Sequence, residues 1–229
     1  MTIQVQCISV AAKRLPLFLM NCYLIFDTDD KDQALVVDPG GEEEKILEAI
    51  EGRQVKGIVL THNHWDHTGV LDKLWRATGA TMYMHKNEAK SIETLLAKKG
   101  ISCSVKASGE ENEGGKLSDG ATLIALSEGA KVPLAKAGLK TLHTPGHTEG
   151  SICLYDEAGA QLLTGDTLFE GAYGRTDFST GSYWHMLKSL EQLAKLPGAT
   201  KVFPGHGQPT TIEREKSRGA LSGIKDSES

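Results

Sequence analysis

Residues 61–67 read THNHWDH, which places three histidines and an aspartate within six positions. Imidazole nitrogens and carboxylate oxygens bind divalent metals. His62 and His64 are two residues apart, so on an extended continuation of a strand both point to one side and can meet one cation. Asp66 and His67 follow a turn, which makes a second metal position geometrically reasonable. Chance clustering, or capping of the following helix, is a much weaker interpretation with so many donors at this spacing.

Three further donors lie downstream, each just beyond an apolar β-type run and beside a glycine. They are His147 in TPGHTEG, Asp166 in LTGDTLF and His206 in FPGHGQP. Glycine lets the backbone turn sharply, so a donor side chain can face inward without a clash. Together the two regions supply seven nitrogen and oxygen donors. That set is too large for one tetrahedral zinc and suits two metals that share a carboxylate.

The string THNHWDH, followed in order by TPGHT, GDTLF and PGHG, resembles the metallo-β-lactamase superfamily. Within it, the chain is most similar to the glyoxalase II-like branch of short, single-domain hydroxyacylglutathione hydrolases. The resemblance runs from about Ile3 to about Ile212. It implies an α/β protein with an αββα sandwich, in which two mixed β-sheets carry helices on their outer faces and a dinuclear site lies at one edge.

The resemblance also implies a role for each donor. The first metal would be held by His62, His64 and His147, the second by Asp66, His67 and His206, and Asp166 would bridge them. The implied cofactors are two divalent ions. Zinc is the favoured identity, with iron and manganese as alternatives, because imidazole and carboxylate donors suit all three.

Two such cations, about 3.5–4 Å apart, share a water and lower its pKa to roughly 7. The predicted reaction is attack of the metal-bound hydroxide on a thioester carbonyl, such as that of a hydroxyacyl-thiol. Asp66 and Asp166 are the predicted catalytic carboxylates, with Asp66 helping to position the nucleophile. The metals stabilise the oxyanion, and no serine or cysteine nucleophile is required.

The residues after Asp166 bear on the substrate. Relatives that open β-lactams commonly carry cysteine or serine at the position of Asp166, so an aspartate resembles the thioesterase-like members. Glutathione thioesterases usually have a lysine and tyrosine pair just beyond it, where this chain has Arg175 and Asp177. Arg175 is a candidate to bind a substrate carboxylate through its planar fork, and Tyr173 a candidate to line the pocket. Alternatively, Arg175 pairs with Asp177.

Three alternatives to a thioester hydrolase stay open. The GRTDF string at 174–178 is also similar to persulfide dioxygenases that use one iron, although PGHG at 204–207 has the hydrolase form. A lactone or other ester hydrolase, and a metal-binding module without turnover, are the others. For His85, His143 and His185, packing or surface roles are favoured over chemistry; His143 could also orient a metal ligand.

Hydrophobic periodicity predicts the elements that position these residues. The predicted strands are 3–10, 22–26, 34–38, 57–61, 80–85, 139–144, 151–156, 160–165 and 200–203, and the predicted helices are 42–50, 69–79, 86–100 and 182–196. The Gly-rich acidic segment 107–120 is predicted to be a solvated loop. The apolar run 15–26 is too short to span a bilayer and is predicted to turn into a buried strand.

Length and composition bound the remaining expectations. The 229 residues suit a single domain, predicted as 1–213 with a flexible tail at 214–229. A net charge of −5 offers no reason to expect nucleic acid or membrane partners, so a small-molecule thioester or ester is the expected partner. Four scattered cysteines, with no Cys-x-x-Cys pair, favour a reducing cytoplasm.

Overall fold

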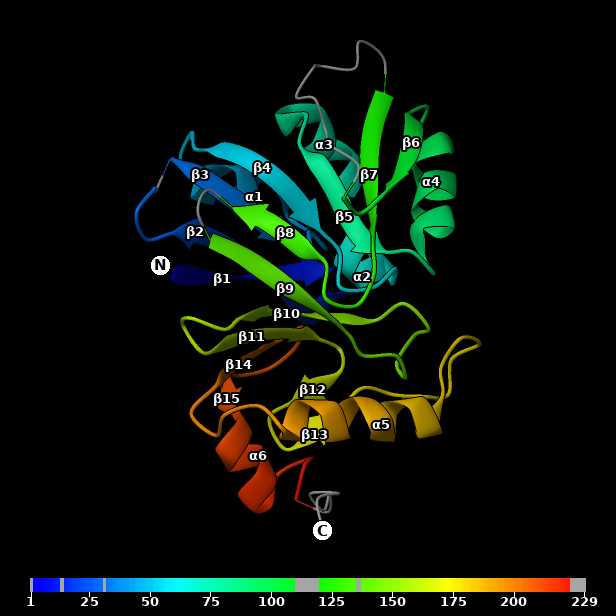
Figure 1. The fold of residues 1–229 in the computed structure, drawn as a ribbon. Coiled ribbons are helices and arrows are strands. Elements are labelled where there is room, and N and C mark those ends of the chain that lie inside the picture. The colour runs from blue at the N-terminus through cyan, green and yellow to red at the C-terminus, as the bar shows by residue number, and fades with distance from the viewer. Residues whose placement is uncertain (1, 13–14, 31, 110–119, 135–136, 223–229) are drawn as a thin grey trace.

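Two large β-sheets and the helices that flank them form most of the computed structural model (Figure 1). The structure describes residues 2–12, 15–30, 32–109, 120–134 and 137–222. From outside to outside, the layers are helices, sheet, sheet and helices. This is the αββα sandwich of two mixed sheets that the sequence predicts.

The first sheet holds the N-terminal half of the chain. In spatial order its strands are β1 (Ile3–Ala12), β2 (Leu15–Asp27), β3 (Gln33–Val37), β4 (Gln54–Val59), β5 (Thr81–His85), β7 (Gly120–Leu126) and β6 (Ser102–Ala107). Its outer face is covered by α1 (Glu43–Ile50), α3 (Leu71–Thr78) and α4 (Ala89–Ala97). A single-turn helix, α2 (Trp65–Thr68), lies at the end of β4.

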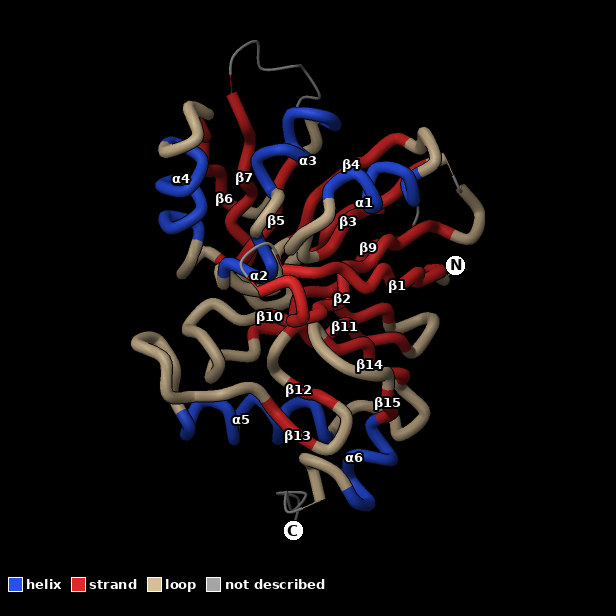
Figure 2. Tube along the Cα trace, turned by 180° about the vertical axis from the view of Figure 1, so that it is seen from behind, coloured by secondary structure: helices blue, strands red, loops and turns tan. Residues whose placement is uncertain are grey.

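The second sheet holds the C-terminal half. Its strands are β15 (Thr210–Thr211), β14 (Lys201–Pro204), β11 (Gln161–Gly165), β10 (Ile152–Asp156), β9 (Ala137–His143) and β8 (Lys131–Leu134). The hairpin of β12 (Leu168–Phe169) and β13 (Ala172–Tyr173) stands apart. Figure 2 shows α5 (Tyr183–Ala194) and α6 (Ile212–Arg218) on the side of the sheets opposite α1, α3 and α4.

Three hydrophobic cores hold the four layers together. Alternate residues of a strand face opposite sides of a sheet. In β2, Cys22 and Leu24 therefore pack toward the helices of the first sheet, while Tyr23 and Ile25 pack between the sheets. A third core joins the second sheet to α5 and α6. Burial on both faces explains why strands such as β10 read as continuous apolar runs rather than alternating ones.

The strand directions bring the donor-bearing loops to one edge. β3 runs parallel to β4, and β11 runs parallel to β14. β9 has the same direction as β11, because each pairs antiparallel with β10 between them. The loops after β4, β9, β11 and β14 carry all seven predicted donors, so each donor follows the carboxyl end of a strand. Carboxyl ends of similarly directed strands are the usual position of ligands in such sheets.

Some elements differ from the predictions. The strands β6, β7 and β8 were not expected: β6 is largely exposed and lacks a clear apolar alternation, while β8 is only four residues long and contains Pro133. Most of the predicted loop at 107–120 lies outside the described residues. Among the described helices, none is long and apolar enough to cross a membrane.

The predicted start of the flexible tail at residue 214 is wrong. α6 extends to Arg218, with Thr211 capping its first turn by accepting from the Arg214 amide. The buried Glu215 carboxylate accepts from the Thr210 hydroxyl at 2.7 Å and from the Gly171 amide at 2.9 Å. Leu221 is buried as well, and residues 223–229 lie outside the described chain. Gly171 is 44 residues from Glu215 in sequence, so composition alone suggested fraying.

Candidate metal centre

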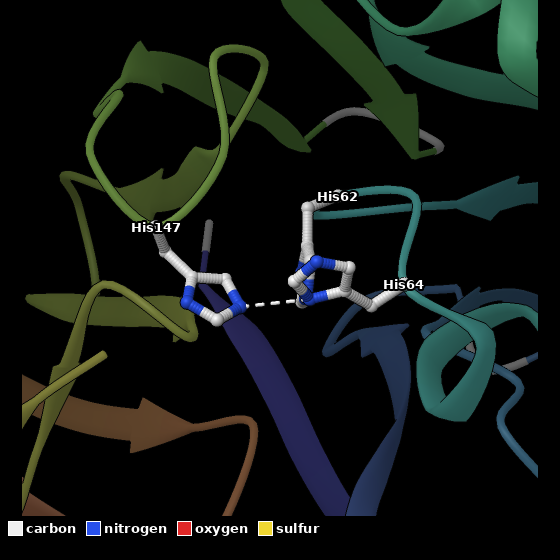
Figure 3. Close-up of side chains that lie close together, drawn as sticks. All are labelled: His62, His64 and His147. Carbon is white, nitrogen blue, oxygen red and sulfur yellow. Dashed lines mark hydrogen bonds between the residues drawn. The ribbon is translucent and has the colours of Figure 1, made fainter. Parts of the chain in front are cut away.

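The first group of donors is a triangle of imidazoles. His62 and His64 come from the loop after β4, and His147 comes from the loop after β9 in the other half of the chain; their rings point toward one another (Figure 3). His62 Nε2 lies 3.0 Å from His64 Nδ1, and His147 Nε2 lies 2.9 Å from the same atom. Three ring nitrogens therefore converge on one small volume, as ligands of a single cation would.

Hydrogen bonds on the far side of the rings set which nitrogens face that volume. His147 Nδ1 donates to the Arg175 carbonyl at 2.8 Å, so its Nε2 carries the lone pair. His62 Nδ1 lies 3.1 Å from the Thr61 hydroxyl, which in turn donates to Asp38 at 2.7 Å. A hydroxyl that already donates to a carboxylate accepts from the imidazole, so His62 Nε2 is also unprotonated. Outer hydrogen bonds of this kind orient metal-binding histidines.

The second group consists of Asp66, His67 and His206. His206 Nε2 lies 3.4 Å from Asp66 Oδ2, and His67 Nε2 lies 3.9 Å from the same oxygen. Both rings are held from behind: His67 Nδ1 donates to Asp38 Oδ2 at 2.9 Å, and His206 Nδ1 donates to the Leu19 carbonyl at 3.0 Å. This group has the donors and the fixed orientation that a second cation requires.

Asp166 lies between the two groups and is the carboxylate that reaches both. Its Oδ1 lies 3.3 Å from His67 Nε2, while its Oδ2 lies 3.5 Å from His147 Nε2 and 3.7 Å from His206 Nε2. Oδ1 thus faces the second group, while Oδ2 lies near one histidine of each group. This is the arrangement of a bridging carboxylate.

Two buried polar atoms indicate whether a cation would fit between these side chains. Within the described part of the chain, His67 Nε2 and Asp166 Oδ1 are buried and neither has a hydrogen-bond partner of standard geometry. Buried polar atoms left without a partner cost about 1–3 kcal/mol each. The donors also form three overlapping groups in which all ligand atoms lie within 4.8 Å of one another. The seven side chains therefore fit two adjacent divalent cations.

Burial keeps the first group in its metal-binding form. Burial lowers the pKa of His62 well below 6.5, and burial together with the His147 imidazole lowers that of His64 to about 4. Burial likewise lowers the pKa of His147. All three rings are neutral at pH 7, and neutral imidazole is the form that coordinates a metal.

The carboxylates have the opposite effect on the second group. Burial lowers the pKa of His67, but the Asp166 and Asp38 carboxylates outweigh burial and raise it well above 6.5. Burial also lowers the pKa of His206, but the Asp66 and Asp166 carboxylates and the Leu19 carbonyl together raise it above 6.5. Burial raises the pKa of Asp166, but the His67, His62 and His206 imidazoles together outweigh burial and the net shift is downward. A cation binding here must displace protons from His67 and His206.

Glycines let the loops approach this closely. A Cβ at Gly205 would lie 2.4 Å from Asp166 Oδ1 and 2.8 Å from His67 Cε1. A Cβ at Gly174 would lie 1.9 Å from the Asp166 carbonyl oxygen. Because real Cβ atoms do not come within 3.0 Å, any side chain at these positions would displace the donors.

An aromatic and charged rim surrounds the first group. Phe178 meets His64 and His147 edge to face, with ring centroids 4.7 and 5.2 Å apart. Arg175 stacks over the Phe178 ring at 4.8 Å and forms a bidentate pair with Asp177 at 2.9 and 2.8 Å. The pairing of Arg175 with Asp177, the alternative considered from sequence, is the one present in the structure.

Two other aromatic side chains near the donors are partly exposed. Trp65, within the motif, is 36% exposed, and Tyr173, the candidate pocket residue, is 38% exposed. The role of Phe178 was not recognised from sequence, because its contacts with His64 and His147 arise only when the loops fold together.

Other histidines lie outside the cluster. His85 is buried and stacks on His143 with centroids 3.8 Å apart, and His143 Nε2 donates to the Glu149 carbonyl at 3.0 Å. His185 is exposed on α5. Asp38 is the residue whose role the structure decides: it holds His67 from behind and receives two hydrogen bonds from Thr61. The sequence feature that could have indicated this role is the position of Asp38 at the end of a buried strand, directly before the PGG turn.

Comparisons with known proteins agree with this geometry. The pattern of the Metallo-beta-lactamase superfamily matches residues 16–206. The "Probable metallo-hydrolase YqgX" of Bacillus subtilis is 33% identical over 214 residues, covering 90% of this chain and 94% of that protein. The "Hydroxyacylglutathione hydrolase GloC" of Haemophilus influenzae is 33% identical over 202 residues, covering 87% and 91%. A solved structure titled "Crystal structure of TTHA1623 in a di-iron-bound form" superposes with a TM-score of 0.71 at 28% identity, covering 93% and 98%.

Proposed function

The chain belongs to the metallo-β-lactamase superfamily, and from that premise we propose that it is a metal-dependent hydrolase that cleaves a thioester at a two-cation centre. The observation that carries the proposal is the position of Asp166, whose carboxylate lies within 3.7 Å of donors in both groups. A carboxylate so placed, with three donors on either side, suits a pair of cations rather than one.

In this proposal His62, His64 and His147 hold the first cation, while Asp66, His67 and His206 hold the second and Asp166 bridges them. Zinc is the proposed ion, and the di-iron form of a 28% identical structure supports iron as the alternative. When bound, two such cations lower the pKa of a water molecule and polarise a substrate carbonyl.

The chain's own residues prepare the reaction. The pKa values of Asp66 and Asp166 are both lowered, so both carboxylates are ionised at neutral pH and can accept hydrogen bonds from an attacking water. We assign Asp66 to orienting that water, because Asp66 lies beside His67 and His206 of the second group alone, whereas Asp166 reaches donors of both groups. Addition of water to the carbonyl carbon breaks the carbon–sulfur bond and yields a carboxylate and a thiol.

A thioester is the proposed substrate class for two reasons. Asp166 occupies the position where β-lactam-opening relatives commonly carry cysteine or serine, and one 33% identical relative is described as a hydroxyacylglutathione hydrolase. Glutathione itself is less well supported, because the bidentate pair with Asp177 engages two nitrogens of Arg175, Nε and Nη2. Tyr173 and Arg175 are proposed to border the substrate. The proposed setting is the cytoplasm, with a small molecule as the partner.

Metal analysis and a thioester assay test the proposal together. The expected result is two divalent ions per chain and metal-dependent release of thiol from a hydroxyacyl-thiol. One iron per chain, with oxygen uptake on addition of a persulfide, would instead identify a dioxygenase. Cleavage of lactones or oxygen esters with no thioester cleavage would identify an ester hydrolase. Metal binding without turnover on any of these would leave a metal-binding module.

A further inference from the structure

Glu88 is a buried acid that the proposed chemistry does not use. It lies between β5 and α4, directly before the first residue of α4, and is only 2% exposed. Within the described residues, neither of its carboxylate oxygens has a hydrogen bond of standard geometry. Burying an ionised carboxyl group costs free energy of folding unless nearby hydrogen-bond donors compensate for the lost water.

The donors that face Glu88 belong to the two loops of the first metal group. The backbone N–H of Asn63, which lies between His62 and His64, faces the carboxylate and lowers its pKa. The Thr148 hydroxyl and the Gly150 N–H, in the loop that carries His147, do the same from the other side. Burial nevertheless dominates and raises the pKa of Glu88. One side chain therefore touches two loops that are more than 80 residues apart in sequence.

Neighbours of Glu88 make the same connections. The Asn63 side chain donates to the Ser91 hydroxyl at 3.1 Å, and that hydroxyl donates to the Glu88 carbonyl at 2.7 Å. On the other side, the Asn87 side chain donates to the Glu149 carbonyl at 3.2 Å. The segment 87–91 is thus hydrogen-bonded to both loops, and Glu88 is the buried residue of this segment that faces them.

Gly150 shows how closely Glu88 fits. A Cβ at Gly150 would lie 2.5 Å from Glu88 Cγ and 2.8 Å from Glu88 Cδ. Glycine is therefore needed here because the Glu88 side chain fills the space, and φ of Gly150 is not in the left-handed region. A substitution at Gly150 would push Glu88 away from Thr148 and Asn63 without removing it.

We propose that Glu88 is a positioning residue, which holds the 61–64 and 147–150 loops at the separation where His62, His64 and His147 converge. The inference rests on the proposed two-cation centre. An apolar side chain of similar volume would fill the space, but it would offer no acceptor to the donors of either loop. Glu88 would then influence the first cation site while lying outside the ligand set, as outer partners of metal ligands do.

The test is cation affinity, measured by competition between a chromophoric chelator and the purified protein with zinc or cobalt(II). Glu88→Ala should weaken the first cation by roughly 10–100-fold and change the cobalt(II) absorption spectrum. Glu88→Gln keeps the volume and one acceptor oxygen, so it should lose less affinity than Glu88→Ala. Glu93→Gln, on the same helix where Glu93 pairs with Lys90 at the surface, is the matched control and should bind as the parent does.

Parental affinity and an unchanged cobalt(II) spectrum in Glu88→Ala would overturn the inference, even if its melting temperature falls. Should Glu88→Ala fail to fold, Gly150→Ala and Glu88→Gln decide the matter, and parental affinity in both would overturn it. The readout is cation affinity and does not depend on thioester cleavage. If the unsubstituted protein binds two cations but cleaves no thioester, the proposed function is refuted, while the affinities of the Glu88 variants can still be compared with that of the unsubstituted protein. A parent that binds no cation overturns both.

Discussion

Asp38→Asn is the substitution whose effect can be worked out most fully. Asp38 is 1% exposed and accepts three hydrogen bonds, from the Thr61 amide at 2.8 Å, the Thr61 hydroxyl at 2.7 Å and His67 Nδ1 at 2.9 Å. Its φ of 54° lies in the left-handed region, which asparagine tolerates nearly as well as aspartate. The substitution therefore changes the acceptors and the charge while leaving the backbone conformation available.

The magnitude follows from those three bonds. An asparagine has one acceptor oxygen, so its NH₂ group must face at least one of the donors that the carboxylate satisfied. An unsatisfied buried donor costs about 1–3 kcal/mol, which is the expected loss in free energy of unfolding for the metal-free protein. His67 also loses the negative charge behind it, and second-site cation affinity should fall by roughly 10–100-fold. That corresponds to about 1.4–2.8 kcal/mol.

Two measurements check this prediction. Urea unfolding of chelator-treated protein gives the stability, and chelator competition gives the two cation affinities separately. Asp156→Asn is a suitable control, because Asp156 is also buried and accepts from the Ile3 amide at 3.2 Å, but lies at the far end of β10 from the metal loops. It should lose stability and keep both affinities. Parental second-site affinity in Asp38→Asn would refute the idea that Asp38 orients His67 for a cation.

Three further predictions address the cluster as a whole. Asp166→Ala should reduce cation stoichiometry below two and abolish thiol release, as measured by elemental analysis and a thiol reagent; two tightly bound cations in this variant would contradict the bridging role. Metal-free protein should be most stable between two limits of pH, measured by urea unfolding across a pH series. The pKa values of His62, His64 and His147 are lowered in the folded state, so the free energy of unfolding should fall as the pH drops below about 6.5. The pKa values of His67 and His206 are raised, so the stability that these two residues contribute should be lost as the pH rises through their folded-state pKa values. A free energy of unfolding that rises steadily through the alkaline range would show that the carboxylates do not hold His67 protonated. Phe178→Ala should raise KM for a thioester severalfold with cation content unchanged, since an aromatic contact contributes about 1 kcal/mol; an unchanged KM would place the substrate elsewhere.

Much of the fold was predictable because strand burial and turn chemistry are local. The apolar runs at 34–38 and 151–156 became β3 and β10, and the amphipathic pattern at 182–196 became α5. β6 was not predicted because an exposed strand lacks the periodic signal that burial produces, and β8 was not predicted because it spans only four residues and contains a proline. α6 was not predicted from the sequence, because its stability depends on Glu215, whose partners Thr210 and Gly171 come from two separate segments.

The sequence by itself determined which side chains carry the chemistry and where along the chain they fall. Seven donors, which follow the ends of apolar runs and of which three are beside glycine, can be recognised because strand ends are rigid and glycines allow sharp turns. What tertiary structure decided is which of them meet. His64 and His147 are 83 residues apart in sequence and 2.9 Å apart in space. Whether Arg175 is open to a substrate, whether Asp38 orients His67 and whether Glu88 joins two loops all depend on contacts between distant segments, which no local pattern records.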